Sequence, residues 1–154
     1  MEEKEIKQKC LNLMETANAI YLSTNNSDGY PHTRMMSNLR NKKENPGAAE
    51  VITNEKKDDF NIYFVTSKSS SKMQQIQINP KVSAYLCNQS EFHTLMLGGR
   101  VEEITDMTFK KQLWQDGWEM HWPGGAEDPE FTVLKLLPSF ARGWYKEGPF
   151  EFKL

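Results

Sequence analysis

The chain has 154 residues, and its 21 acidic and 19 basic side chains give a formal charge of −2. This length suits a single domain, residues 1–154, with a core of its own. The near-neutral charge and the lack of a basic stripe exclude nucleic acid and anionic membranes as expected partners. A charged N-terminal stretch and no long apolar segment predict a cytoplasmic protein. Cys10 and Cys87 are far apart, which indicates two buried, reduced thiols.

The first part of the chain predicts a helix followed by a hairpin. Apolar residues recur every three or four positions over 3–18, the period of an amphipathic helix. Alternating apolar residues then flank the turn "SDG", whose glycine permits positive φ, so 19–26 and 30–39 predict two hairpin strands. The polar segment 40–59 has no clear pattern, and its "AEVIT" predicts an irregular edge piece.

The rest of the chain predicts mainly strands. A strand at 60–67 leads into a short helix, Ser70 to Ile78, which ends at "NP". Asp106 is a good N-cap for a helix over 107–122, and "PGGAEDPE" follows as a loop. Further strands are expected for the segments "KVSAYLCN", "EFHTLMLGGRVEEI", "FTVLKLLP", "SFARGWYKE" and "PFEFKL". Strands without regularly alternating helices predict a mainly β fold, a six- to seven-stranded antiparallel barrel with flanking helices.

The stretch "FVTSKSSSK" suggests an anion site. Thr66 ends a strand, and the following serines place hydroxyls and free backbone N–H groups at the positive end of a helix dipole, beside Lys72. Arg34 lies on an otherwise apolar hairpin strand, where it needs a partner if buried. Ordinary helix capping by the serines and a surface salt bridge for Arg34 are the alternatives.

Other candidate residues have simpler interpretations. Trp114, Trp118 and Trp122 stand at steps of four, which favours core or dimer packing over an aromatic wall for a planar substrate. The histidines His32, His93 and His121 are scattered and predict structural roles, so no catalytic residue is assigned. The acidic residues Glu127, Asp128 and Glu130 lack the spacing of metal ligands, and no metal is expected.

Several motifs in order carry a resemblance to a known family. The segments are "LSTNNSDGYPHTRMM", "YFVTSKSSSKMQQIQINPKVSAYL", "GGRVE", "PGGAEDPE" and "GWY". Together they resemble the FMN-binding split barrels similar to pyridoxamine phosphate oxidase, in the branch that is similar to general stress protein 26. The resemblance implies a homodimeric, FMN-dependent oxidoreductase with each flavin in a groove between two protomers. It covers residues 19–145.

The resemblance also implies site residues. Arg34, Met35 and Met36 would run along the flavin, Val65 and Thr66 would line the edge of its ring, and Ser71 and Lys72 would hold its phosphate. Thr94 would reach the flavin from the neighbouring subunit, and Trp144 would close over it. A short phosphate hinge without a dinucleotide fingerprint favours FMN over FAD.

Three departures from the family pattern argue against oxidation of pyridoxamine phosphate. Ser71 stands where the vitamin oxidases have the arginine of an Arg-Lys pair, Leu39 replaces a lysine, and the tail has no Arg-x-His triplet. One cation fewer predicts weaker FMN binding than in those enzymes. The alternative function is a carrier or stress sensor that holds a flavin, deazaflavin or haem without turnover.

Overall fold

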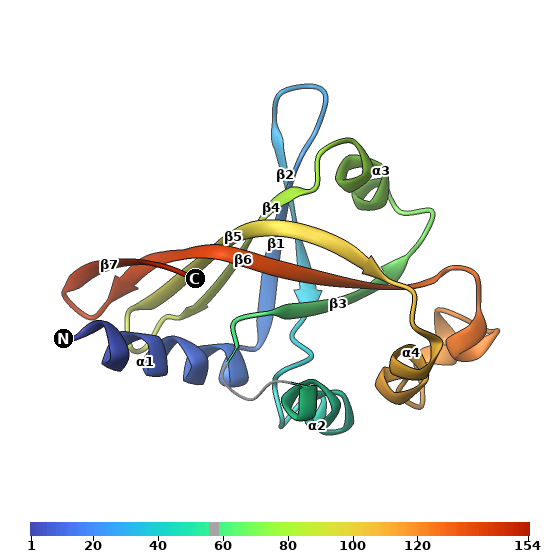
Figure 1. The fold of residues 1–154 in the computed structure, drawn as a ribbon, viewed down its shortest axis with the longest axis horizontal. Coiled ribbons are helices and arrows are strands. Elements are labelled where there is room, and N and C mark those ends of the chain that lie inside the picture. Colours follow the sequence, from blue (N-terminus) through green and yellow to red (C-terminus); the bar gives the residue numbers. More distant parts are fainter. Residues whose placement is uncertain (56–58) are drawn as a thin grey trace.

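The computed structural model describes residues 1–55 and 59–154, and one antiparallel sheet forms its centre (Figure 1). The strand order is β2-β1-β4-β5-β6-β3, and β7 also pairs with β6. The strands are β1 (Ala19–Asn25), β2 (Pro31–Ser37), β3 (Ile62–Ser67), β4 (Lys81–Asn88), β5 (His93–Ile104), β6 (Phe131–Tyr145) and β7 (Gly148–Lys153). The helices are α1 (Glu3–Thr16), α2 (Pro46–Glu55), α3 (Ser71–Ile78) and α4 (Met107–Leu113), with short 3₁₀ turns η1 (Trp118–Met120) and η2 (Gly125–Glu127). The sheet curls into a half-barrel, which confirms the expected mainly β split-barrel fold.

The long strand β6 connects the two ends of the sheet. Its first half pairs with β3 and its second half with β7, while β5 runs along both halves. The sequence indicated two strands here, because Pro138 lies in the middle and cannot donate a hydrogen bond to a sheet. A shift of register between Gly98 and Gly99 of β5 falls opposite this proline. The irregularity accommodates Pro138, and the chain continues as one strand.

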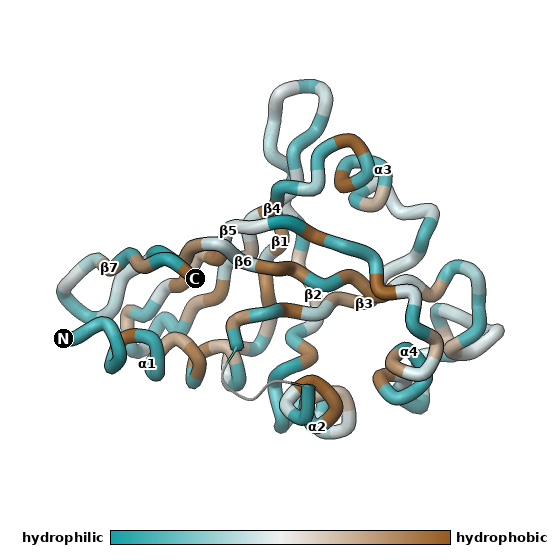
Figure 2. Tube along the Cα trace, in the orientation of Figure 1, coloured by the Kyte–Doolittle hydropathy of each residue, from teal (hydrophilic) through white to brown (hydrophobic). Residues whose placement is uncertain are grey.

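Two hydrophobic clusters pack against this sheet. The first fills the concave side, where Cys10, Leu13 and Met14 of α1 meet inward-facing strand residues such as Leu22 and Leu97. The second lies under α2 and α4 and is built from Leu39, Ala48, Ile52, Tyr63, Phe109, Leu113, Trp122, Phe131 and Val133. Hydrophobic segments follow the central strands, whereas the connecting loops are largely hydrophilic (Figure 2). No helix in the described ranges is long and apolar enough to cross a bilayer.

The hairpin of β1 and β2 forms with its turn at the predicted glycine. Leu22 lies opposite Arg34, and Thr24 lies opposite His32. Gly29 has a φ of 85°, a left-handed conformation that costs glycine little. The hairpin projects beyond the sheet beside α3 (Figure 1). It therefore brings the side chains of β2 close to the beginning of that helix.

Residues 46–55 correct the expected edge piece at "AEVIT". The segment is a helix, α2, that begins with Pro46 in the first turn, where a missing N–H costs nothing. Ala48, Ala49 and Ile52 form its buried face. Three consecutive β-branched residues, Val51, Ile52 and Thr53, favoured a strand in the sequence pattern of this helix. The "NEKKDD" part of the segment lies partly at 56–58, outside the described residues.

The helix expected over 107–122 ends much earlier. Asp106 caps α4 as predicted, and its side chain accepts a hydrogen bond from the Thr108 backbone N–H at 3.0 Å. The helix ends at Leu113, because Trp114 has an extended conformation and Gly117 has a φ of 99°. The three tryptophans nevertheless converge on Phe131, with ring centroids 5.0–5.9 Å from its ring. This arrangement supports the packing interpretation.

The two cysteines occupy different environments. Cys10 is fully buried, whereas Cys87 is only half-buried, which corrects the expectation of two buried thiols. The Cys10 sulfur lies 3.9 Å from Nε2 of His93, and burial raises the pKa of its thiol from 9.0 to about 12. The folded state therefore holds this proton more tightly. The protonated Cys10 thiol therefore makes its full contribution to the stability of the folded state below about pH 9. This contribution is lost as the pH rises towards 12.

We expect Cys10 to resist alkylation in the folded protein at pH 8, because burial excludes the reagent and disfavours the reactive thiolate. Cys87 supplies the internal reference in the same sample. Mass spectrometry of iodoacetamide-treated protein, with and without denaturant, measures both sites. Denaturant should expose Cys10 to labelling, and rapid labelling of Cys10 without denaturant would contradict its burial.

Candidate functional site

Two cationic side chains meet at the corner where β2, β3 and the beginning of α3 come together. Arg34 extends from β2 on the same face as buried Met36, and Lys72 lies in the first turn of α3. The Lys72 ammonium donates to the Thr66 hydroxyl at 2.8 Å. Thr66 is the next-to-last residue of β3 and is 6% exposed, so its position is fixed by the sheet. The predicted residues Arg34, Thr66 and Lys72 therefore form one cluster, the cationic corner.

The Arg34 guanidinium is held entirely by neutral acceptors. Its Nη1 lies 2.9 Å from the His32 carbonyl, 3.3 Å from the Leu22 carbonyl and 2.7 Å from the Thr24 hydroxyl. Its Nη2 donates to the side-chain oxygen of Gln75 at 3.0 Å. These contacts fix the orientation of the guanidinium. Among the residues that the structure describes, its positive charge has no negative partner.

Burial disfavours the charged state of both cations. Burial lowers the pKa of the Arg34 guanidinium, and burial together with the nearby Arg34 charge lowers the pKa of Lys72. Within residues 1–55 and 59–154, neither side chain forms an ion pair with an aspartate or glutamate. A half-buried pair of like charges is unfavourable unless an anion compensates it. The corner is therefore suited to an anion such as phosphate.

The loop from β3 to α3 is anchored to the lobe that carries the tryptophans. Trp122 donates its indole N–H to the Ser67 hydroxyl at 3.1 Å. The Glu130 carboxylate accepts from the Ser69 backbone N–H at 3.0 Å and from its hydroxyl at 2.9 Å. Glu130 thus binds the loop, and no group of three or more His, Cys, Asp or Glu side chains that could hold a metal lies among the described residues. These contacts fix the approach to α3.

Ser70 is the serine whose hydroxyl approaches that of Thr66 within this chain. Ser70 is the N-cap residue of α3, and its hydroxyl lies 3.5 Å from that of Thr66. The Ser71 side chain is exposed in the first turn of the helix. The resemblance assigns Ser71 to the phosphate, and the structure has both serines at the start of α3.

Other predicted residues lie around the corner without joining the cluster. Met36 is 9% exposed and belongs to the concave core, whereas Met35 is 69% exposed on the opposite face of β2. Val65 is half-buried and packs against the second hydrophobic cluster. The alternation of β2 and β3 separates these side chains as their sequence pattern predicts.

Thr94 and Trp144 lie on a different part of the sheet. They are paired across β5 and β6, and the Thr94 hydroxyl accepts from the Trp144 backbone N–H at 3.0 Å. Two strands, β1 and β4, separate β5 from β2, which carries Arg34. Within one chain, the structure therefore does not bring Thr94 and Trp144 together with the cationic corner.

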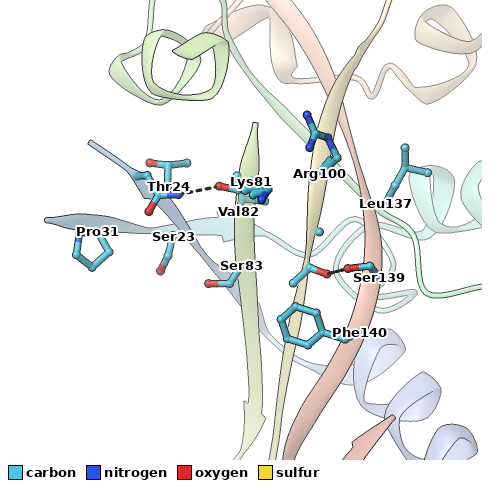
Figure 3. A pocket seen from close by; sticks show the side chains of 13 residues that line it. Ser23, Thr24, Pro31, Lys81, Val82, Ser83, Arg100, Leu137, Ser139 and Phe140 are labelled. Carbon is cyan, nitrogen blue, oxygen red and sulfur yellow. Dashed lines mark hydrogen bonds between the residues drawn. The ribbon is translucent and has the colours of Figure 1, made fainter. Parts of the chain in front are cut away.

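A cavity of about 610 Å³ opens on the convex face of the sheet (Figure 3). The Phe140 ring lies against Gly98 in its wall, where any Cβ would collide with the ring. Lys81 and Arg100 are directly opposite each other on β4 and β5. The lining residues are Ser23, Thr24, Asn25, Pro31, Lys81, Val82, Ser83, Gly98, Gly99, Arg100, Leu137, Ser139 and Phe140. Only Thr24 is shared with the contacts of the cationic corner.

Thr24 and Gln75 are the main residues of the corner that sequence reasoning missed. The Thr24 hydroxyl donates to Gln75 while it accepts from Arg34. Gln75 follows Lys72 by three positions on α3, so both share one side of the helix. Two features of the sequence could have indicated Gln75: its spacing from Lys72, and its place as a polar residue between the buried Met73 and Ile76.

Comparisons with known proteins identify the family. Residues 5–153 match the family described as pyridoxamine 5'-phosphate oxidase like, and the chain belongs to it. The chain is 26% identical over 145 residues to general stress protein 26 of Bacillus subtilis, covering 92% of this chain and 90% of that protein. The stated resemblance, including its general stress protein branch, is thereby confirmed.

Solved structures confirm the fold. A Clostridium acetobutylicum protein related to general stress protein 26 superposes with a TM-score of 0.76 at 23% identity, covering 99% of this chain and 97% of that one. The general stress FMN/FAD binding protein from Xanthomonas citri gives a TM-score of 0.67 at 17% identity, covering 98% and 96%. At such identities the structural likeness establishes the split-barrel fold alone.

Proposed function

We propose that this protein binds FMN and acts as a flavin-dependent oxidoreductase. The observation that carries the proposal is the pair of cations Arg34 and Lys72, which share a half-buried corner and have no carboxylate partner among the described residues. A phosphate would compensate both charges. The FMN/FAD binding named for the Xanthomonas citri relative is consistent with this assignment.

In this proposal the chain holds and orients the cofactor. Arg34 and Lys72 bind the phosphate, and the Ser70 and Ser71 hydroxyls lie at the start of α3 beside it. The strand segments that carry Met35 and Met36 on β2 and Val65 and Thr66 on β3 would border the flavin. The flavin supplies hydride or electron transfer when bound, and the protein supplies position and electrostatics.

The proposed substrate is not pyridoxamine phosphate. Leu39 stands where the vitamin oxidases carry a lysine, and its side chain is 1% exposed in the second hydrophobic cluster. A residue packed there contacts no ligand. The final strand, "GPFEFK", also lacks the Arg-x-His triplet.

We further propose a homodimer. Thr94 and Trp144 contribute to a flavin only if a second copy faces the convex side of the sheet. That side exposes a row of paired residues on adjacent strands, Met35, Tyr21, Tyr85, Met96 and Arg142. Such an apolar surface suits an interface between copies. The cavity of Figure 3 opens on this same face and would border the partner.

Two smaller proposals complete this assignment. Residues 1–154 act as one FMN-binding domain, since both hydrophobic clusters pack on the same sheet. The location is cytoplasmic, which agrees with two cysteines that form no disulfide.

The oxidoreductase activity is tested by anaerobic reduction of the FMN-loaded protein. NADH or NADPH is added, and the bleaching of the flavin absorbance is followed with time. Bleaching much faster than that of free FMN supports an enzyme. Tight FMN binding with no acceleration by either donor would contradict nicotinamide-dependent turnover and favour the carrier function.

A further inference from the structure

Gln75 is the central hydrogen-bonding residue of the cationic corner. It lies on the inner side of α3 and is 7% exposed. Its side-chain oxygen accepts from the Thr24 hydroxyl and from Arg34 Nη2. Its side-chain nitrogen lies 3.3 Å from the Asn26 oxygen and 3.2 Å from Nδ1 of His32. One buried amide thus connects α3 to both strands of the β1–β2 hairpin.

The surrounding contacts define the orientation of this amide. The Gln75 oxygen faces two donors, and its nitrogen faces two acceptors, Asn26 Oδ1 and His32 Nδ1. The His32 ring then directs its other nitrogen towards the Asp28 carboxylate, at 3.1 Å. Turning the amide over would place donors against Arg34 and Thr24. The network therefore selects one orientation, in which an oxygen is presented to the guanidinium.

The charge of residue 75 matters as much as its geometry. A half-buried arginine is ordinarily paired with a carboxylate, which fixes it and also neutralises it. A neutral amide at this position fixes the guanidinium through a hydrogen bond and leaves its charge available. An incoming phosphate then meets an oriented cation that no carboxylate of residues 1–55 and 59–154 pairs with.

We propose that Gln75 positions Arg34 for the FMN phosphate while keeping its positive charge uncompensated. This inference rests on the proposed FMN site and adds a determinant of its affinity. Gln75 is a positioning residue, because it acts on the ligand through Arg34. A carboxylate at position 75 would instead occupy the guanidinium and compete with the phosphate.

The test compares Gln75→Glu with Gln75→Met. Gln75→Glu keeps the size of the side chain and adds the competing charge, so FMN affinity should fall about 10-fold. Gln75→Met removes the hydrogen bonds without adding charge, and we expect a smaller loss. Gln74→Glu adds the same charge at an exposed neighbouring position of α3 and is the matched control, with FMN affinity near wild type.

Riboflavin separates an effect on the phosphate from a general disturbance of the site. It has the flavin ring without the phosphate, so its affinity should be equal in the wild type and in both Gln75 variants. Fluorescence titrations with FMN and riboflavin provide both constants. In an Arg34→Met background, Gln75→Glu should have no further effect on FMN, because the residue through which it acts is absent.

The outcomes distinguish this inference from the proposed function. If the wild type binds neither FMN nor inorganic phosphate, the proposed FMN site is wrong and the inference fails with it. If the wild type binds FMN and Gln75→Glu binds it equally well, only the role of Gln75 is overturned. Equal losses for FMN and riboflavin would also overturn it. If Gln75→Glu does not fold, Gln75→Met must still weaken FMN alone.

Discussion

Replacement of Lys72 by methionine is expected to weaken FMN binding about 10- to 100-fold, the effect of losing a charged hydrogen bond to a phosphate. Lys72 contacts only the Thr66 hydroxyl in the described structure, at 2.8 Å, and its positive charge faces Arg34. Fluorescence titration of the apoprotein measures the change. Riboflavin affinity should stay the same, since the lost partner is the phosphate.

The same substitution should leave the ligand-free protein at least as stable as the wild type. Burial and the Arg34 charge lower the pKa of Lys72, so its charged form opposes folding at neutral pH. Methionine removes that charge and keeps most of the side-chain volume. Lys68→Met, on the same loop, is the control, because Lys68 is exposed and its ammonium lies 4.0 Å from Glu103. An unchanged FMN affinity for Lys72→Met, with wild-type folding, would remove Lys72 from the site.

Replacement of Tyr85 by glutamate is expected to convert the proposed dimer to a monomer. Tyr85 is 40% exposed on the convex face, between Tyr21 and Met96 on the neighbouring strands. A carboxylate in a buried apolar interface is costly, and loss of a central aromatic residue typically removes at least about 2 kcal/mol of binding free energy. Size-exclusion chromatography with light scattering measures the molecular mass.

FMN affinity should fall together with the dimer, because the proposed site takes Thr94 and Trp144 from the partner. Tyr30→Glu provides the control, since Tyr30 is 72% exposed near the tip of the hairpin and away from the row of residues that contains Tyr85. It should remain dimeric. A wild-type protein that is monomeric while FMN-bound would contradict the composite site, and a dimeric Tyr85→Glu variant would place the interface elsewhere.

Much of the fold could be predicted from the sequence because its signals are local. The alternation in β1 and β2 and the turn at Gly29 determine the hairpin, and Asp106 marks the beginning of α4. Features that depend on distant contacts were missed. Pro138 indicated a strand end, but the irregularity opposite it at Gly98 and Gly99 belongs to another strand.

Distant contacts also decide the structure of the segment that carries Trp114, Trp118 and Trp122. Steps of four predicted one helical face, and the three rings do gather around Phe131, yet the helix ends at Leu113. A turn at Gly117 and a short 3₁₀ segment bring the rings together instead. The contacts with Phe131 determine the course of the chain here. Phe131 lies outside the segment in which the tryptophans repeat every four residues.

For the candidate site, the charged residues could be predicted and their supporting contacts could not. Arg34 and Lys72 are conspicuous because a cation in an apolar strand or at a helix start needs an explanation. Glutamine is a common residue on helix surfaces. Only the packing of α3 against the hairpin makes Gln75 a buried hydrogen-bonding centre. Its role is therefore visible only in three dimensions.

The most direct test of the FMN assignment is the visible absorption spectrum of the purified protein. The protein is reconstituted with FMN, excess cofactor is removed, and the bound molecule is identified by mass. We predict a flavin band that corresponds to about one FMN per subunit, with a higher melting temperature, because a ligand that binds the folded state stabilises it. A colourless protein whose melting temperature does not change with FMN would contradict the assignment of the Arg34 and Lys72 corner as a flavin phosphate site.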